Sequence, residues 1–380
     1  MRIRYFAHSW LSDWNHGNAH FLRGLASALV GRGHEVRLYE PMPGPRGGWS
    51  LAHLLEEPKG AQAVQQMRET FPDLDVRLFG PGGSGTPLSR RYGLPWVQDW
   101  REELREAEVV IVHEWNEPEL FTWLLGERRR YGFRTLLHDT HHRAWSEPAL
   151  LDRLPLRELD GVIAFGESVR QLYEKDGRAR RSYTLQEGAD VVHFRTRGGT
   201  EAVDDVVWLG NWGDEERTRE LEEFLFQPVR EAQAKTKIYG VRYPVEARAR
   251  LQQTGISYGG YLANLDAPAA YARARVTMHI PRGPYAGALP GIPTIRVFEA
   301  LASGMALLSA PWTDSETLFT AGKDYWPVRN RVEAAALLVQ LLSRPKQRKE
   351  LGRQGAATVA ARHTCGHRAQ ELEAICHDLG

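Results

Sequence analysis

Short apolar segments of strand length alternate with amphipathic helical segments over most of the chain. Residues 3–7 predict a strand, residues 19–32 predict a helix with one apolar face, and residues 35–39 predict a second strand. Further strands are expected at residues 76–79, 109–113, 135–138 and 161–165. Strand–helix–strand repetition of this kind produces a parallel sheet with helices on both faces, so the sequence predicts an α/β protein.

The same alternation restarts after a polar stretch, residues 195–205, whose paired glycines and charges are typical of a linker. The sequence therefore predicts two Rossmann-like domains, residues 1–195 and 205–355. Because parallel sheets of this type bind ligands at the carboxyl ends of their strands, the domains are expected to face each other across a cleft and to hold one substrate each. In the second domain, strands are expected at residues 206–210, 237–240, 256–258, 276–280, 306–309 and 324–328, with helices at residues 216–226, 267–274, 294–303, 333–342 and 346–362.

Composition argues against several classes of function. A length of 380 residues suits two or three domains, and 49 basic against 48 acidic residues leave a net charge of +1. Proteins that bind nucleic-acid phosphates normally carry a strong basic excess, so no nucleic acid is expected as a partner. No run of 18 apolar residues occurs and the N-terminus has no apolar signal core, so we expect no integral membrane contact. The chain has only two cysteines, which favours a reducing, cytoplasmic location.

Residues 289–309 (LPGIPTIRVFEALASGMALLS) carry the most informative pattern of the second half. A turn at residues 290–293 directly precedes a helix for which Thr294 is the expected N-cap. The free N–H groups and the positive dipole end of such a helix start suit a diphosphate. Glu299, about one and a half turns further on, is placed to accept hydrogen bonds from ribose hydroxyls. Many ordinary αβ units have the same spacing, so the spacing alone leaves a structural role open.

Residues 298–304 (FEALASG) resemble the helix that cradles the nucleotide-sugar in GT-B glycosyltransferases, in particular the group-1 and spore-maturation-like (CgeB-like) branch. Residues 207–218 (VWLGNWGDEERT) are similar to the strand and glycine turn that, in this family, precede a basic residue aimed at the donor phosphates. The resemblance covers about residues 200–365. Over the N-terminal half only the opening strand, loop and helix are similar.

The resemblance implies a donor site in the C-terminal domain. Arg217 is the expected cation for the donor phosphates, and Glu299 is the expected ribose ligand. Residues 239–244 and 258–261 fall where the family builds its base-binding loops. The donor-binding residues that the resemblance implies are Gly210, Asn211, Arg242, Tyr258, Gly259, Arg282, Gly291, Ile292, Pro293, Thr294 and Glu299.

One position departs from the family pattern. Many relatives have a carboxylate eight residues before the glutamate matched by Glu299, and this chain has Gly291 there, so the identity of the donor stays open. The Asp-x-Asp signature of metal-dependent glycosyltransferases occurs only as Asp73-Leu74-Asp75, between a proline and the start of a strand, which favours a turn. GT-B enzymes generally need no metal, and no metal or other cofactor is expected here.

The N-terminal half is expected to supply the acceptor side. Polar residues lie in the first strand-to-helix loop and directly after two further predicted strands, where side chains project from the carboxyl edge of the sheet. Structural capping is the alternative for each of them. The acceptor-side candidates are His16, Gly17, Asn18 and Glu114, and the catalytic candidates are Asp139, His141 and Arg217.

Residues 356–380 predict a helical stretch that is interrupted at Gly366 and contains both cysteines, Cys365 and Cys376, which are expected to be packing thiols. In the family the last helix crosses back onto the N-terminal domain, and this stretch is long enough to do so.

The combined prediction is a metal-independent, hexosyltransferase-like glycosyltransferase. It would move a sugar from a nucleotide-diphosphate-sugar donor to a glycan, lipid-linked, protein or small-molecule acceptor, and the resemblance implies retention at the anomeric carbon. Two alternatives stay open. A nucleotide-sugar epimerase of the same fold would convert the donor without an acceptor. A non-catalytic nucleotide-sugar-binding protein would bind the donor without turnover.

Overall fold

The computed structural model describes residues 1–380 except residues 45–46, 81–89, 91–92, 197–200 and 214–215. The chain forms two compact units, one made of Met1–Gln186 with Arg368–Gly380 and the other of Glu187–His367. The predicted linker, residues 195–205, lies in the second unit, and its residues 197–200 are outside the described residues.

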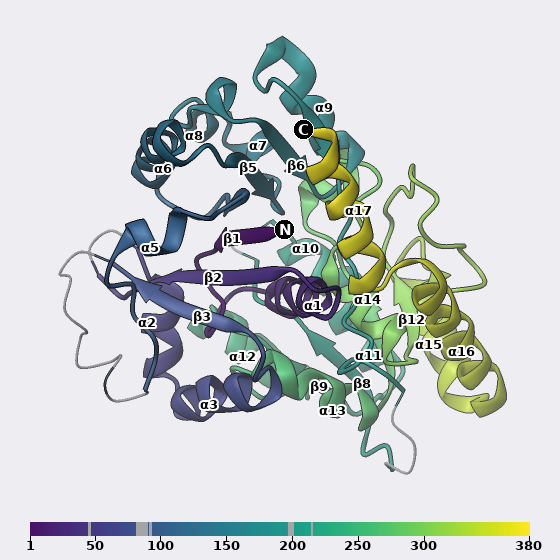
Figure 1. The fold of residues 1–380 in the computed structure, drawn as a ribbon. Coiled ribbons are helices and arrows are strands. Elements are labelled where there is room, and N and C mark those ends of the chain that lie inside the picture. Colours follow the sequence, from purple (N-terminus) through teal and green to yellow (C-terminus); the bar gives the residue numbers. More distant parts are fainter. Residues whose placement is uncertain (45–46, 81–89, 91–92, 197–200, 214–215) are drawn as a thin grey trace. The chain divides into compact units, whose positions relative to one another are not determined.

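The first unit contains a seven-stranded sheet with the order β3-β2-β1-β4-β5-β6-β7, in which all neighbouring strands are parallel (Figure 1). Its central strand β4 has the sequence VVIVH, and all five residues are buried. Such β-branched runs suit a strand that is covered on both faces. The strands are β1 (Arg2–Phe6), β2 (Glu35–Pro41), β3 (Asp75–Phe79), β4 (Val109–His113), β5 (Arg134–Asp139), β6 (Gly161–Ala164) and β7 (Ser182–Thr184).

Helices connect these strands, and their ends follow local sequence signals. The helix α6 begins with Pro118, which suits the first turn because proline lacks an amide hydrogen, and it is followed by Gly132 at φ +81°. The described helices are α1 (Ala19–Gly31), α2 (Trp49–Glu56), α3 (Gly60–Thr70), α5 (Trp100–Leu104), α6 (Pro118–Tyr131), α7 (Arg143–Ser146), α8 (Pro148–Leu151) and α9 (Glu167–Glu174), with short 3₁₀ turns η1 (Leu156–Glu158) and η2 (Lys175–Gly177).

The second unit contains a six-stranded parallel sheet with the order β10-β9-β8-β11-β12-β13. Its apolar core packs between the sheet and its helices and includes Trp208, Phe224, Ile238, Met278 and Leu338. The strands are β8 (Asp204–Leu209), β9 (Thr236–Tyr239), β10 (Ser257–Tyr258), β11 (Ala274–His279), β12 (Ala306–Ser309) and β13 (Trp326–Pro327). The helices are α10 (Thr218–Leu221), α11 (Gln227–Glu231), α12 (Val245–Gln253), α13 (Ala267–Ala272), α14 (Ile295–Ala302), α15 (Arg331–Ser343) and α16 (Pro345–Arg362), with short turns η3 (Glu222–Phe226), η4 (Asn264–Asp266) and η5 (Pro284–Ala288).

Both sheets have a topological switch point, where the strand order reverses direction. In the first unit it lies between β1 and β4, and in the second between β8 and β11. Open α/β sheets bind their ligands outside the carboxyl ends of the strands at this point. The fold therefore selects the loops that follow these four strands as the places to look for a site.

The last helix, α17 (Cys365–Asp378), belongs to the first unit from Arg368 onward, whereas residues 356–367 of the predicted C-terminal stretch belong to the second unit. Its Glu373 carboxylate accepts two hydrogen bonds of 2.6 Å from Arg32 and lies 2.6 Å from the His34 ring. This confirms the predicted return of the C-terminal helix to the N-terminal domain. The interruption precedes Gly366, because the Thr364 hydroxyl accepts a hydrogen bond of 3.2 Å from the His367 N–H and so caps a helix that starts at Cys365.

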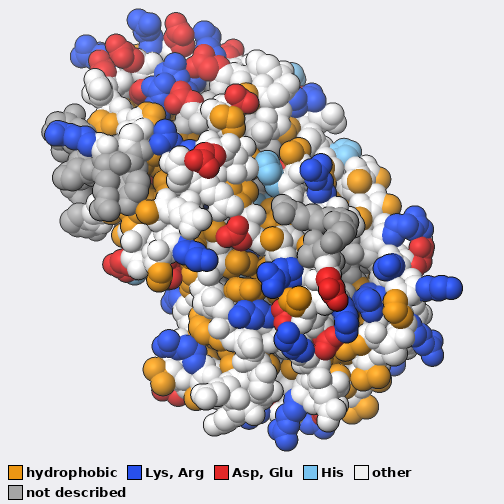
Figure 2. Space-filling model, turned by 90° about the horizontal axis from the view of Figure 1, so that it is seen from below, with side chains coloured by type: hydrophobic (Ala, Val, Ile, Leu, Met, Phe, Trp, Pro, Cys, Tyr) orange, Lys and Arg blue, Asp and Glu red, His pale blue; other side chains and the backbone are white. Residues whose placement is uncertain are grey.

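Both cysteines are free and buried, as predicted. Burial raises the pKa of the Cys376 thiol to about 12, so it is not a reactive thiolate at neutral pH. None of the helices in the described ranges is long and apolar enough to cross a membrane. Basic and acidic side chains both occur on the face shown in Figure 2, in keeping with the net charge of +1.

Candidate functional site

Arg217 connects the two loops at the switch point of the second unit. Its guanidinium donates hydrogen bonds to the carbonyl of Asn211, after β8, and to the carbonyl of Ile280, after β11, the latter at 3.3 Å. The guanidinium carbon also lies 5.0 Å from the centre of the Trp208 ring. These contacts fix Arg217 where this fold binds ligands.

Arg217 belongs to a cluster of three cations. Burial, followed by the charges of Arg282 and Arg296, lowers the pKa of Arg217 to about 9. Arg282 is paired with Glu216 at 2.6 Å, and Arg296 is paired with Glu299. Among the described residues Arg217 has no carboxylate within 4.0 Å. One positive charge of the cluster is therefore not offset by a paired carboxylate there, which favours an anionic ligand.

Hydrogen bonds from side chains to backbone groups connect the loops that follow β8, β9 and β10. The Asn211 side chain accepts a hydrogen bond of 2.9 Å from the Val241 N–H, and the Tyr258 hydroxyl donates one of 2.7 Å to the carbonyl of Gly240. A Cβ atom on Gly240 would lie 2.0 Å from the Gly210 carbonyl oxygen, so glycine is needed for this close approach. The structure thus brings four of the predicted donor residues to one edge of the sheet: Gly210, Asn211, Tyr258 and Gly259, with the exposed Arg242 beside them.

The turn before α14 has an unusual backbone. Gly291 has φ +92° and donates a hydrogen bond of 2.7 Å to the Thr313 carbonyl, and a Cβ atom on it would lie 2.6 Å from Oε1 of Glu316. A carboxylate from another loop thus lies beside the position where many relatives have one. Ile292 and Pro293 are buried, and their contact with a donor stays a prediction.

Thr294 precedes α14 as predicted, but it is not a side-chain cap. Its φ is +62°, which is rare for a β-branched residue, and its hydroxyl makes no capping hydrogen bond. The Val297 N–H of the first turn donates a hydrogen bond of 3.2 Å to the Thr294 carbonyl instead. Binding of an anion at this described helix start stays a prediction.

Glu299 lies on the inner face of α14 and is fully buried. Its carboxylate binds Arg296 and accepts a hydrogen bond of 3.3 Å from Asn264. The contact between Glu299 and a ribose stays a prediction. In the Arg296–Glu299 ion pair, Arg296 reaches the surface, with 28% of its side chain exposed.

At the switch point of the first unit, four buried histidines form what we call the histidine cluster: His8, His16, His113 and His138. Ring centres are 4.3 Å apart for His8 and His16, 5.4 Å for His8 and His113, and 5.9 Å for His113 and His138. Burial lowers the pKa of each ring, and that of His113 falls to about 3. The cluster is therefore uncharged at neutral pH.

Two buried carboxyl groups lie next to this cluster. Glu114 accepts a hydrogen bond of 3.2 Å from the Thr140 hydroxyl, and Asp139 accepts bonds from the Tyr173 hydroxyl at 2.7 Å and the His141 N–H at 3.0 Å. Burial raises the pKa of Glu114 to about 8 and that of Asp139 to about 7. Groups with such values can accept or donate a proton near neutral pH.

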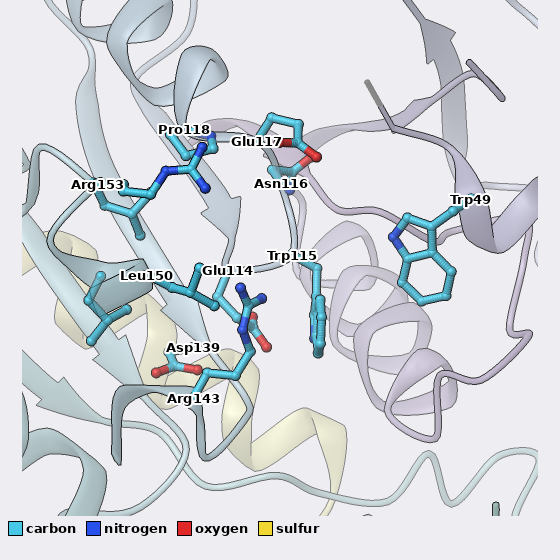
Figure 3. A pocket seen from close by; sticks show the side chains of 12 residues that line it. Trp49, Glu114, Trp115, Asn116, Glu117, Pro118, Asp139, Arg143, Leu150 and Arg153 are labelled. Carbon is cyan, nitrogen blue, oxygen red and sulfur yellow. The ribbon is translucent and has the colours of Figure 1, made fainter. Parts of the chain in front are cut away.

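Glu114 and Asp139 line a cavity of about 260 Å³. Trp49, Trp115 and leucines form its apolar walls, and Arg143 lies between Asp139 and Trp115 (Figure 3). Its lining residues are Trp49, Glu114, Trp115, Asn116, Glu117, Pro118, Asp139, Arg143, Leu150, Leu151, Arg153 and Leu154.

The predicted acceptor-side residues converge on this region. His16 is in the histidine cluster, the His141 ring lies 5.1 Å from that of Trp115, and Asn18 donates a hydrogen bond of 3.4 Å to the Thr140 carbonyl. Gly17 lies between two of them in the loop after β1. Trp49, Arg143 and Arg153 were not predicted, because each lies within or after a helix and only the folded chain brings them together. His8 had a usable signal, since it closely follows β1.

Within the described ranges, no group of three or more His, Cys, Asp or Glu side chains is placed to hold a metal ion. Asp75, in the only Asp-x-Asp segment, begins β3 and binds Arg77 at 2.7 Å. This ion pair supports a structural role for Asp75.

Comparisons with known proteins concern both units. Residues 217–374 match the family model described as "Glycosyl transferase-like". Sucrose-phosphate synthase from Thermosynechococcus elongatus is similar in structure, with a TM-score of 0.64 and 14% identity over 100% of this chain and 99% of that one. The Anabaena protein HepE, solved with UDP and glucose, has a TM-score of 0.66 and 14% identity over 100% of both chains. A search of curated proteins finds no significant match.

Proposed function

We propose that this chain is a glycosyltransferase that takes its sugar from a nucleoside-diphosphate donor bound to the second unit. The match of residues 217–374 to a glycosyl transferase-like family and the GT-B fold support this proposal. The acceptor binds in the cavity of the first unit. The reaction proceeds without a metal ion and with retention at the anomeric carbon, as the resemblance to group-1 enzymes implies.

The observation that carries the donor assignment is the placement of Arg217. It lies at the switch point, is held by two carbonyls and a tryptophan ring, and shares a cluster with Arg282 and Arg296. A diphosphate gains negative charge when it leaves the sugar. Fixed cations and backbone N–H groups stabilise that charge without having to reorganise. HepE, a structural neighbour of the same fold, was solved with UDP, and UDP is therefore the first nucleotide to test.

Glu114, Asp139 and His141 would orient the acceptor. The two carboxyl groups can exchange hydrogen bonds with a hydroxyl group, and Trp115 offers a ring surface for a sugar. Transfer then requires the donor sugar and the acceptor hydroxyl to meet within reacting distance.

The activity can be tested with a panel of nucleotide-sugars and acceptors. We expect release of the nucleoside diphosphate to depend on the acceptor, and NMR of the product to show the donor's anomeric configuration. Conversion of the donor to an epimer without acceptor would favour an epimerase. Donor binding without turnover against any acceptor would favour a binding protein. Addition of a chelator should leave the rate of transfer unchanged. Loss of activity on addition of the chelator would contradict metal independence.

A further inference from the structure

The cavity of the first unit contains an arginine whose hydrogen-bonding groups are not used by the protein. The Arg143 guanidinium carbon lies 4.4 Å from the centre of the Trp115 ring. A guanidinium stacked in this way keeps its N–H groups, which lie in its plane, available to another partner. In the described part of the chain, no carboxylate lies within 4.0 Å of it and no hydrogen bond from its side chain is formed.

Two other arginines of this unit, Arg23 and Arg128, are different. Arg23 donates hydrogen bonds to the carbonyls of Trp10, Leu11 and Ser12 at 2.7, 3.1 and 3.1 Å. Arg128 is paired with Asp160 at 3.0 Å. These side chains have structural partners, whereas Arg143 lines a cavity, where it stacks on Trp115 and its charge acts on Glu114 and Asp139 without an ion pair within 4.0 Å in the described part of the chain. Arg143 is therefore placed to bind a ligand.

A second cation, Arg153, lines the same cavity (Figure 3). The buried carboxyl groups do not cancel these two charges, because burial raises the pKa of Glu114 to about 8 and leaves it largely protonated at neutral pH. The histidine cluster is uncharged there, and the remaining acidic residues of the lining are Asp139, whose pKa is raised to about 7, and the exposed Glu117. The cavity thus combines two cations with two buried carboxyl groups of reduced charge and the exposed Glu117.

We propose that the cavity binds an acceptor that carries an oxyanion, either a phosphate or a carboxylate, which Arg143 and Arg153 hold while the rest of the molecule lies against the tryptophan and leucine walls. The planar fork of arginine matches the two oxygens of such a group. The cavity volume of about 260 Å³ limits the bound part to roughly one sugar ring or a group of similar size. This inference rests on the proposed function, since it specifies the acceptor of that reaction.

The test is calorimetric titration of the full chain with glucose 6-phosphate, glucuronate and glucose. We expect at least one charged sugar to bind 10-fold or more tightly than glucose, and the better of the two identifies the oxyanion. Arg143→Gln and Arg153→Gln should each reduce that preference by 10-fold or more while leaving glucose binding within about 2-fold. The exposed Arg129→Gln on α6, outside the cavity lining, is the matched control and should retain the preference.

Equal binding of charged and neutral sugars, no binding of either charged sugar, or an unchanged preference in both cavity variants would overturn the proposal. Arg143→Lys, which keeps the charge and loses the fork, should retain part of the preference and provides a second variant if Arg143→Gln does not fold. UDP titrations of the same samples distinguish failure of the proposed donor site from failure of the proposed oxyanion site. If wild-type protein binds the charged sugar but not UDP, the donor proposal fails and the oxyanion site stands, and the reverse result leaves the donor site standing alone.

Discussion

At position 291, both the backbone conformation and the space next to it favour glycine. Gly291 has φ +92°, a conformation that residues with a side chain rarely adopt, and its missing Cβ leaves room for the Glu316 carboxylate and the Ser315 hydroxyl. The sequence showed only that a carboxylate found in many relatives is absent here. The structure adds that another acidic side chain lies next to that position.

Replacing this glycine should be costly. Gly291→Ala would place a Cβ atom 2.6 Å from Oε1 of Glu316 in a strained backbone conformation, so we expect a loss of about 1–3 kcal/mol in the unfolding free energy of the second unit. Chemical denaturation measures this loss. The exposed Gly287→Ala is the control, because nothing lies within 4 Å of its Cβ position. Equal stability of the two variants would refute the steric argument.

Glu114 should make stability depend on pH. Burial raises its pKa from 4.5 to about 8, so between these values the folded state keeps a proton that the unfolded state releases. Its contribution to stability is therefore complete below pH ~4.5 and is lost as the pH rises towards 8. Glu114→Gln cannot ionise, and its unfolding temperature should fall less between about pH 5 and about pH 8 than that of the wild type.

Calorimetric scans at several pH values measure this difference. The exposed Glu119→Gln on α6 removes a carboxylate of the same unit and should follow the wild type. If Glu114→Gln shows the full wild-type pH dependence, the carboxyl group of Glu114 is not protonated in the folded state as described.

Residues of the two candidate sites differed in how well the sequence revealed them. Glu114 directly follows β4, Asp139 is the last residue of β5, and Arg217 lies between β8 and α10. Strand ends are visible in the sequence as the points where apolar runs stop. Arg143 and Arg153 could not be found in this way. They lie beyond the end of β5, around short helices whose orientation depends on packing rather than on local periodicity.

At the scale of elements, the expected strands at residues 109–113 and 306–309 coincide with β4 and β12. The edge strand β7 was missed, because three residues, two of them Ser and Thr, carry no apolar alternation. The helix expected at residues 216–226 is α10 followed by the π-helical η3, and the helical stretch continues beyond the predicted range as α11. Pro228 lacks the amide hydrogen that would continue regular α-helical bonding, which accounts for the wider preceding turn.

The attachment of α17 to the first unit can be tested at this scale. Glu373 has 16% of its side chain exposed and binds Arg32 and His34, both outside its own helix. Glu373→Gln should lower stability by no more than about 1 kcal/mol and should speed hydrogen exchange at the amides of α17.

Glu371→Gln is the matched control for this attachment. Its partner, Arg368, is in the same helix, so the loss should be at most about 0.5 kcal/mol without faster exchange over the whole of α17. Equal hydrogen-exchange rates at the α17 amides in Glu373→Gln and Glu371→Gln would show that Glu373 does not anchor the helix.

At the scale of the whole molecule, the repetition of strand and helix in two halves predicted two Rossmann-like sheets, and the strand orders and the similarity to HepE and sucrose-phosphate synthase over the full chain confirm the GT-B fold. The family match over residues 217–374 confirms the resemblance to glycosyltransferases. Donor, acceptor and stereochemistry depend on side chains that differ among proteins of one fold, so the fold alone does not determine them.

The central claim, a nucleotide-sugar donor held by Arg217, is tested most directly by calorimetric titration of UDP into the wild type, Arg217→Gln and Arg219→Gln. Arg219 is two residues away, exposed on α10, and serves as the control. Hydrogen bonds to charged groups contribute about 1.5–3 kcal/mol, so Arg217→Gln should weaken UDP binding by roughly 10-fold to 100-fold. Arg219→Gln should bind UDP like the wild type. Absence of UDP binding to the wild type, or equal affinity in all three proteins, would contradict the account.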